Sequence, residues 1–140
     1  REAKDGDLLR PGLALVAPGD YHMLLQKRGP DGYSVSIKQA AKIMHHRPSV
    51  DLLFQSAAPI AGSRAVAGIF TGMGRDGAEG LLALRKSGAI TFAQDEKTSI
   101  VYGMPKVAME IGAAERSVPL HGIAAYIVKA AGLAAASRIA

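Results

Sequence analysis

The sequence predicts an α/β fold in which parallel strands alternate with helices. Two apolar runs, Val66 to Phe70 and Ala89 to Ala93, have the length of buried strands and flank a helical pattern. A strand, a helix and a second strand in this order favour parallel pairing, because the helix carries the chain back across the sheet. Strict alternation of apolar and polar residues from Tyr33 to Lys38 indicates a half-buried strand of an antiparallel hairpin.

The composition is that of one compact domain. Apolar residues make up 49% and charged residues 21% of the 140 positions, which is typical of a folded chain with a core. No run reaches 18 uninterrupted apolar residues, so no membrane insertion is predicted. The absence of cysteine excludes disulfides and thiol chemistry and is compatible with the reducing cytoplasm, where we expect the protein.

The net charge of +5 does not by itself indicate nucleic-acid binding. The 17 basic residues are scattered, and the few aromatic residues are not interleaved with them. A basic surface that attracts an acidic protein partner explains the charge as well, because electrostatic steering needs only a net field. We therefore expect no nucleic acid among the partners.

The first half of the chain predicts mainly β structure. Leu13 to Ala17 is a short apolar run before a Pro-Gly turn, which suits a buried strand. Tyr21 to Gln26 and Tyr33 to Lys38 predict the hairpin, with the turn Gly29 to Gly32 before the second strand. In that strand the tyrosine, valine and isoleucine should share one face and the serines the other. Ser49 is placed to cap a helix that runs to about Ala58.

The second half predicts alternating strands and helices. A helix from Asp76 to Ser87 places acidic residues in its first turn and basic residues in its last, as the helix dipole favours. Gly88 follows as a C-terminal stop. Three further elements are predicted: a helix from Met104 to about Ile111, a short strand from Val118 to Leu120, and a helix from about Gly122 to Ala136.

The turn from Thr71 to Gly77 follows a strand and precedes a helix, where open α/β sheets bind ligands. Three interpretations are open. In the first, Asp76 only caps its own helix. In the second, Gly72-x-Gly74-x-x-Gly77 is a dinucleotide-binding fingerprint, although a carboxylate beside the helix N-terminus would repel a pyrophosphate. In the third, Asp76 is the acid that orients a histidine in a catalytic triad.

Several motifs resemble, in order, those of the bacterial chemotaxis protein-glutamate methylesterases of the CheB family. They cover nearly the whole chain, so chance similarity is much less probable than for any single motif. The matching segments are Ala17-Pro-Gly19, His46-Arg-Pro-Ser-Val-Asp51, Thr71-Gly-Met-Gly-Arg-Asp-Gly-Ala-Glu-Gly80, Ala93-Gln-Asp-Glu96 and Val101-Tyr-Gly-Met-Pro105.

The resemblance implies a doubly wound, mostly parallel sheet with helices on both faces and an antiparallel hairpin. It implies that residues 1–140 are the C-terminal part of one methylesterase catalytic domain whose N-terminal strands lie upstream. The implied reaction is hydrolysis of glutamyl methyl esters on chemoreceptors, with deamidation of selected glutamines, and no cofactor. By this resemblance Asp76 is the triad acid, and Met73 lines the active site and offers its backbone N–H to the oxyanion.

The triad serine and histidine of the family lie in early turns that have no counterpart here. No serine of this sequence, from Ser34 to Ser137, sits in a glycine-rich turn after an apolar strand. Without nucleophile and base the isolated chain is expected to be inactive. The partners implied are the methylated cytoplasmic helices of chemoreceptors, the upstream part of the same domain and a receiver domain. A non-catalytic binding or scaffold module is the alternative from a different class.

The remaining polar candidates are weaker. His45 and His46 are adjacent, and no carboxylate or further histidine lies at ligand spacing, so no metal site is predicted. His22 and His121 are expected to be surface residues or residues with satisfied hydrogen bonds. Met104 is expected to shape a loop.

Overall fold

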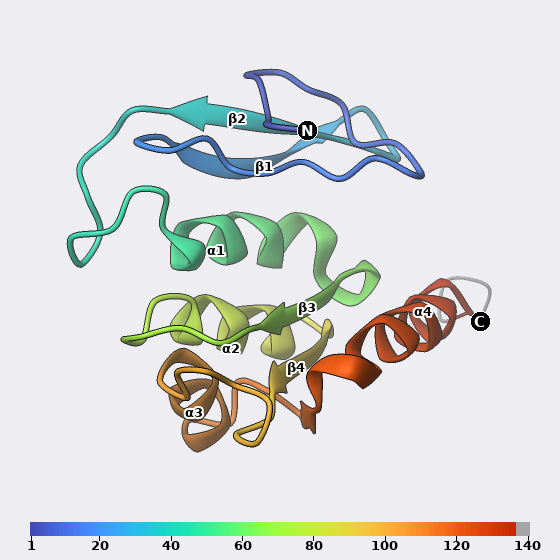
Figure 1. Cartoon of the computed structure of the whole chain (residues 1–140). Helices are drawn as coiled ribbons and strands as arrows, with labels where there is room; N and C mark the ends of the chain where they lie inside the picture. The colour runs from blue at the N-terminus through green and yellow to red at the C-terminus, as the bar shows by residue number, and fades with distance from the viewer. Residues whose placement is uncertain (137–140) are drawn as a thin grey trace.

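The computed structural model describes residues 1–136 and arranges them in layers (Figure 1). A hairpin lies above helix α1, which lies above α2 and the sheet, and α4 covers the far side of that sheet. The elements are β1 His22–Arg28, β2 Gly32–Lys38, α1 Val50–Ala61, a 3₁₀ turn Gly62–Arg64, β3 Val66–Ile69, α2 Ala78–Lys86, β4 Ile90–Gln94, α3 Met104–Glu110, β5 Arg116–Val118 and α4 Leu120–Ala136.

The sheet contains β3, β4 and β5 in that order, and all three strands are parallel. Ile69 and Ala93 face α2 and α3 and belong to the largest buried cluster, together with Leu81 of α2. Phe92 points to the opposite face and packs against Ile123 of α4. These contacts confirm the predicted α/β fold with a parallel sheet and helices on both faces.

The hairpin pairs β1 and β2 antiparallel, as predicted, with Met23 opposite Ile37. The predicted polar face of β2 is wrong, because Ser34 and Ser36 are buried along with Val35. The reason is that β2 is a central strand: the chain around Asp7 exchanges backbone hydrogen bonds with Val35 on its second edge. These contacts bring the first residues of the chain against β2, so more of this strand is covered than the sequence pattern indicated.

The strand predicted from Leu13 to Ala17 is also wrong. The structure forms only one isolated bridge there, between Glu2 and Val16, and Val16 is 63% exposed. Its backbone finds partners only in Arg1 and Ala3. A short apolar run predicts a strand only when a longer partner segment is available, and here the partner is two or three residues long.

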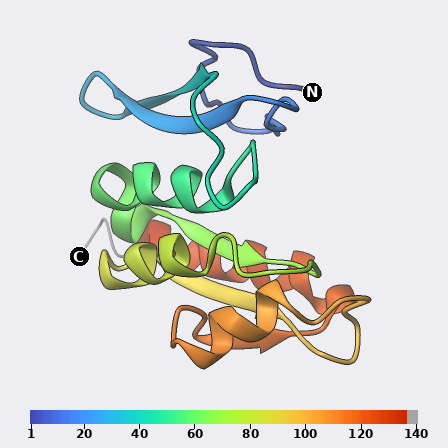
Figure 2. The same ribbon diagram turned by 90° about the vertical axis from the view of Figure 1, so that its left-hand side faces the viewer.

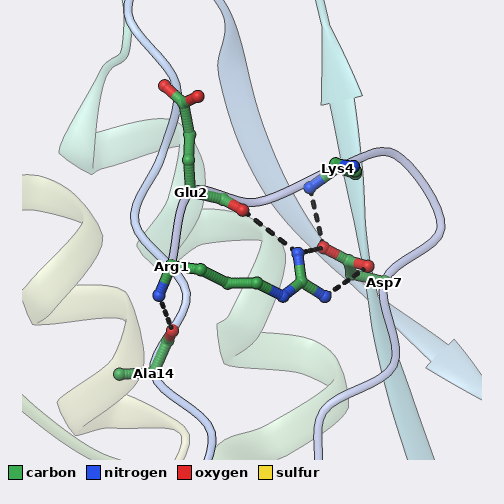
Figure 3. A network of polar contacts seen from close by, with 5 residues as sticks. All are labelled: Arg1, Glu2, Lys4, Asp7 and Ala14. Carbon is green, nitrogen blue, oxygen red and sulfur yellow. Dashed lines mark hydrogen bonds and ion pairs between the residues drawn. The ribbon is translucent and has the colours of Figure 1, made fainter.

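The first residues are held by an exposed polar network (Figure 3). Arg1 donates two hydrogen bonds to the Asp7 carboxylate, at 2.7 and 2.8 Å, and the backbone N–H of Lys4 donates a third at 2.7 Å. These bonds, the Arg1 bonds foremost, lower the pKa of Asp7 from its ordinary 3.8 to about 2.

No helix among residues 1–136 is long and apolar enough to span a membrane.

Helix α1 connects the hairpin layer to the sheet layer. It packs on β1 along one side and on α2 along the other, and Figure 2 shows it lying between them. Its N-terminus is therefore brought to the turn between β3 and α2. This placement builds the candidate site.

Candidate active site

The turn after β3 differs from the prediction at the start of α2. The helix begins at Ala78, with Gly77 as its N-cap at a φ of 92°, so Asp76 lies outside it. A positive φ is readily adopted by glycine, and it turns the chain before the helix starts. Asp76 consequently does not cap its own helix. The structure contradicts that simple capping interpretation and gives the carboxylate a different partner.

The Asp76 carboxylate caps helix α1 from outside. Oδ1 accepts from the Ser49 hydroxyl at 2.9 Å and from the Asp51 N–H at 3.1 Å, while Oδ2 accepts from the Val50 N–H at 2.7 Å. The side chain is buried, and within residues 1–136 it forms no ion pair. A negative charge at a helix N-terminus is stabilised by the free N–H groups and by the helix dipole. Asp76 is thus fixed by dipoles and not by a cation.

Ser49 is the N-cap of α1, as the sequence predicted, and its hydroxyl accepts from Leu52 N–H at 3.4 Å. Its own backbone N–H donates to Nδ1 of His22 at 3.1 Å. Since Nδ1 accepts, the proton of this ring is on Nε2, which donates to the Ala41 carbonyl at 2.9 Å. His22 is completely buried, with both nitrogens satisfied, which agrees with the expectation of a satisfied residue.

A serine, a histidine and an aspartate therefore lie together, but they are not connected as a catalytic triad. The Ser49 hydroxyl donates to the carboxylate of Asp76, and His22 touches only the backbone of Ser49. A triad needs the histidine between the hydroxyl and the acid, and a hydroxyl that can reach substrate. Ser49 is 2% exposed, so it is not a nucleophile in this arrangement.

Asp51 returns the capping interaction from α1 to α2. Its Oδ1 accepts from the Gly80 N–H at 2.7 Å. Asp76, which precedes α2, thus caps the start of α1, and Asp51, in the first turn of α1, bonds to the start of α2. The sequence reasoning did not assign a role to Asp51 or His22. The available signal was the segment from His46 to Asp51, whose Ser-x-Asp ending places a cap and a first-turn acid side by side.

Met73 lies in the same turn and is 82% exposed. Within residues 1–136 its backbone N–H makes no hydrogen bond. The turn is fixed on its strand side, because Thr71 N–H donates to the buried Gln94 side chain at 2.9 Å, and Val101 N–H donates to the Thr71 hydroxyl at 2.9 Å. A free N–H at the carboxyl end of a strand, in a fixed turn, is a donor available to a ligand.

The comparison with known families decides the identity. A family model described as CheB methylesterase matches residues 1–127. The chain belongs to the CheB methylesterase family. It is similar to the protein-glutamate methylesterase/protein-glutamine glutaminase 2 of Pseudomonas aeruginosa, with 53% identity over 130 residues that cover 93% of this chain and 37% of that protein.

Two further CheB relatives give the same result. The protein of the same name from Rhodospirillum rubrum is 55% identical over 130 residues, 93% of this chain and 36% of that protein. The crystal structure of the Thermotoga maritima CheB methylesterase catalytic domain matches with a TM-score of 0.88 and 35% identity, covering 92% of this chain and 68% of that one. The chain spans little more than a third of the curated CheB proteins it matches.

The dinucleotide interpretation does not fit this member of the CheB family. A pyrophosphate would need the free N–H groups at the start of α2, and that of Gly80 is already bonded to Asp51. Helix α1 also fills the space in front of that start: a Cβ on Gly77 would lie 2.7 Å from the Val50 side chain. Gly77 serves close packing against α1, Gly72 lies against Met104, and Gly74 allows a positive φ in the turn.

The other candidates show no contact that would give them a part in the candidate site. His45 and His46 are exposed, and His46 forms a backbone bridge with Ile43. Among the described residues no three His, Asp or Glu side chains are grouped to hold a metal ion. Met104 packs beside Gly72 and so shapes the turn, as expected. Ser137 lies outside the described residues.

Proposed function

We propose that the protein is a protein-glutamate methylesterase and glutamine deamidase that acts on chemoreceptors, and that Asp76 is the acid of its Ser-His-Asp triad. The observation that carries the proposal is a buried carboxylate, fixed by three donors without a cation, at the ligand-binding end of a parallel sheet. The relatives named as methylesterase and glutaminase supply the reaction class.

The carboxylate retains capacity for one more donor. Two carboxylate oxygens offer about four lone-pair positions, and the bonds to Asp76 occupy three of them. Oδ2 accepts only one of those bonds, from Val50 N–H. In the proposal the fourth position accepts from the Nδ1–H of a histidine outside residues 1–140. The negative charge then stabilises the imidazolium formed when that histidine takes the proton of the serine nucleophile.

Met73 is proposed to stabilise the oxyanion. Attack of the serine hydroxyl on the glutamyl ester carbonyl makes a tetrahedral intermediate with a negative oxygen, and the Met73 N–H is proposed to donate to it. The intermediate releases methanol and leaves an acyl-enzyme, which water hydrolyses to glutamate. A glutamine side chain follows the same course with ammonia as the leaving group.

The nucleophile and the base must come from outside this chain in the proposal, because its own Ser49 and His22 are connected differently. We expect the upstream part of the catalytic domain to supply them, with a receiver domain as regulatory partner in the cytoplasm. The isolated chain is accordingly predicted to be inactive, and activity should appear only when that part is present.

The test is made in the full-length enzyme with methylated receptor as substrate. Replacing Asp76→Asn keeps the shape of the side chain and removes its charge. We expect kcat for methanol release to fall by roughly 10³- to 10⁴-fold, the size seen when a triad acid becomes an amide. Rates equal to wild type would remove the catalytic assignment of Asp76 and favour the alternative in which this chain serves only as a scaffold or binding module.

Asp51→Asn is the matched control. Asp51 is a second buried carboxylate at the same helix junction, but its acceptor oxygen serves Gly80 in α2. An amide oxygen still accepts from that N–H, so the folded variant should keep its activity within a few-fold. Comparable losses in both variants would show that the junction acts on stability alone.

A further inference from the structure

We infer that Ser49 is a positioning residue whose hydroxyl fixes the orientation of the Asp76 carboxylate. His22 in turn fixes Ser49 through the Ser49 backbone N–H. The inference rests on the proposed role of Asp76 and adds to it two side chains that do not touch substrate. Its basis is a continuous chain of hydrogen bonds: His22 to the Ser49 backbone, and the Ser49 hydroxyl to Asp76.

The Ser49 hydroxyl makes a shorter hydrogen bond with the Asp76 carboxylate than with the backbone of α1. Its bond to Oδ1 of Asp76 is 2.9 Å long, whereas its contact with the Leu52 N–H, the ordinary capping bond, is 3.4 Å. An N–H···O distance of 3.4 Å is beyond the usual range, so the capping bond is weak. Oδ1 accepts from Asp51 N–H as well, which leaves Oδ2 as the oxygen with spare capacity.

This distribution sets the direction of the acid. Because Oδ1 already accepts two hydrogen bonds, rotation of the carboxylate would break both of them and would point Oδ2 in another direction. Two backbone N–H groups come from the regular start of α1 and would remain in any variant that keeps the helix. The hydroxyl is the one donor supplied by a side chain, and it is therefore the one that a substitution can remove alone.

His22 fixes the position of that hydroxyl. The ring is buried, and its two nitrogens join the Ser49 N–H to the Ala41 carbonyl, so the N-cap residue is tied to the hairpin as well as to α1. The other charged groups near the junction are Asp51, which is bonded to α2, and Arg75, which pairs with Glu79 at the surface. Neither of these two charged side chains donates to the Asp76 carboxylate; Asp51 contributes only its backbone N–H.

Three substitutions in the full-length enzyme separate positioning from capping. Ser49→Ala removes the hydroxyl and the cap, Ser49→Gly removes the hydroxyl but remains a good N-cap residue, and Ser49→Thr keeps both. We expect kcat to fall roughly tenfold in the alanine and glycine variants alike, with KM within about twofold and with activity restored by threonine. Thermal melting should separate alanine from glycine, since only alanine loses a good cap residue.

The pH profile supplies the readout that a purely structural role would not change. Once the hydroxyl no longer holds the carboxylate in place, its contact with the imidazolium weakens, so the acid limb of kcat/KM should move to lower pH in Ser49→Gly. In an Asp76→Asn background the same substitution should have no further effect, because there is no charge to aim. An unshifted limb, or a tenfold loss that persists in that background, overturns the inference. A harmless Asp76→Asn substitution overturns the proposed function instead.

Discussion

Two carboxylates of this molecule each accept three hydrogen bonds, and their surroundings are opposite. Asp7 lies in the exposed N-terminal loop and accepts two bonds from the Arg1 guanidinium and one from Lys4 N–H. Asp76 is buried and accepts only from a hydroxyl and two backbone N–H groups. The first charge is neutralised by a cation, and the second is held by dipoles alone.

The difference supports the proposal that Asp76, and not Asp7, is the triad acid. An ion pair cancels the field that a developing imidazolium would feel, whereas aligned dipoles fix the carboxylate and leave its net charge in place. Burial also keeps water from screening that charge. The same number of hydrogen bonds therefore holds a paired carboxylate in the N-terminal loop and an unpaired, buried one at the junction of α1 and α2, as the proposed triad acid requires.

The largest expected effect on stability separates these two sites directly. Replacing Asp76→Ala leaves the buried Ser49 hydroxyl and the first N–H groups of α1 without their acceptor. We expect the free energy of unfolding to fall by roughly 2–4 kcal/mol, the range for unsatisfied buried donors and a lost cap. Urea denaturation of this variant and of Asp7→Ala makes the comparison.

Asp7→Ala should shift the urea midpoint far less, because its partners return to water when the carboxylate is removed. Both variants lose three hydrogen bonds, so the number of bonds is matched and only the surroundings differ. Equal midpoints for the two variants would show that burial does not distinguish these networks.

A smaller effect is expected where the helices that build the buried site touch. A Cβ added at Gly80 of α2 would lie 2.7 Å from the Phe54 Cβ and 2.8 Å from the Asp51 carbonyl oxygen. Gly80→Ala should therefore separate α1 from α2 and destabilise the protein by about 1–3 kcal/mol. Circular dichroism during thermal unfolding measures the change.

Gly132→Ala in α4 is the matched control for that substitution. Among residues 1–136 a Cβ there meets no atom within 4 Å outside the backbone of its own helix turn, so the usual helix preference for alanine should stabilise the protein by about 0.5–1 kcal/mol. A Gly80→Ala variant as stable as Gly132→Ala would contradict the close contact between α1 and α2.

The sequence predicted the individual helices and strands better than the contacts between them. The capping role of Ser49, the parallel strands on either side of α2 and the hairpin were all visible in local patterns. The contact between Ser49 and Asp76 was not, because the two residues are 27 positions apart and meet only when α1 packs on α2. Local patterns carry no information on which helix a carboxylate will cap.

The errors have the same physical origin. The run from Leu13 to Ala17 has the composition of a strand, but within residues 1–136 its one bridge is to Glu2, and so no strand forms. The alternating pattern predicted a half-buried β2 with the serines on the face opposite Val35, and it did not indicate that the N-terminal segment pairs with this strand and that both serines are buried. His22 gave no signal of its burial, since a single histidine in a hairpin fits a surface or an interior position equally.

The smallest effect concerns the pH dependence of the exposed network. The pKa of Asp7 is about 2 in the folded protein and ordinarily 3.8, so the unfolded chain binds the proton first as the pH falls. The stabilisation is therefore present above pH 4 and is lost as the pH falls through about 2. Asp7→Asn should lose less stability than wild type over this window, as measured by urea midpoints at each pH. In 1 M KCl the two profiles should converge, because the salt screens an exposed ion pair; profiles that are already parallel at low salt would contradict the role given to Arg1.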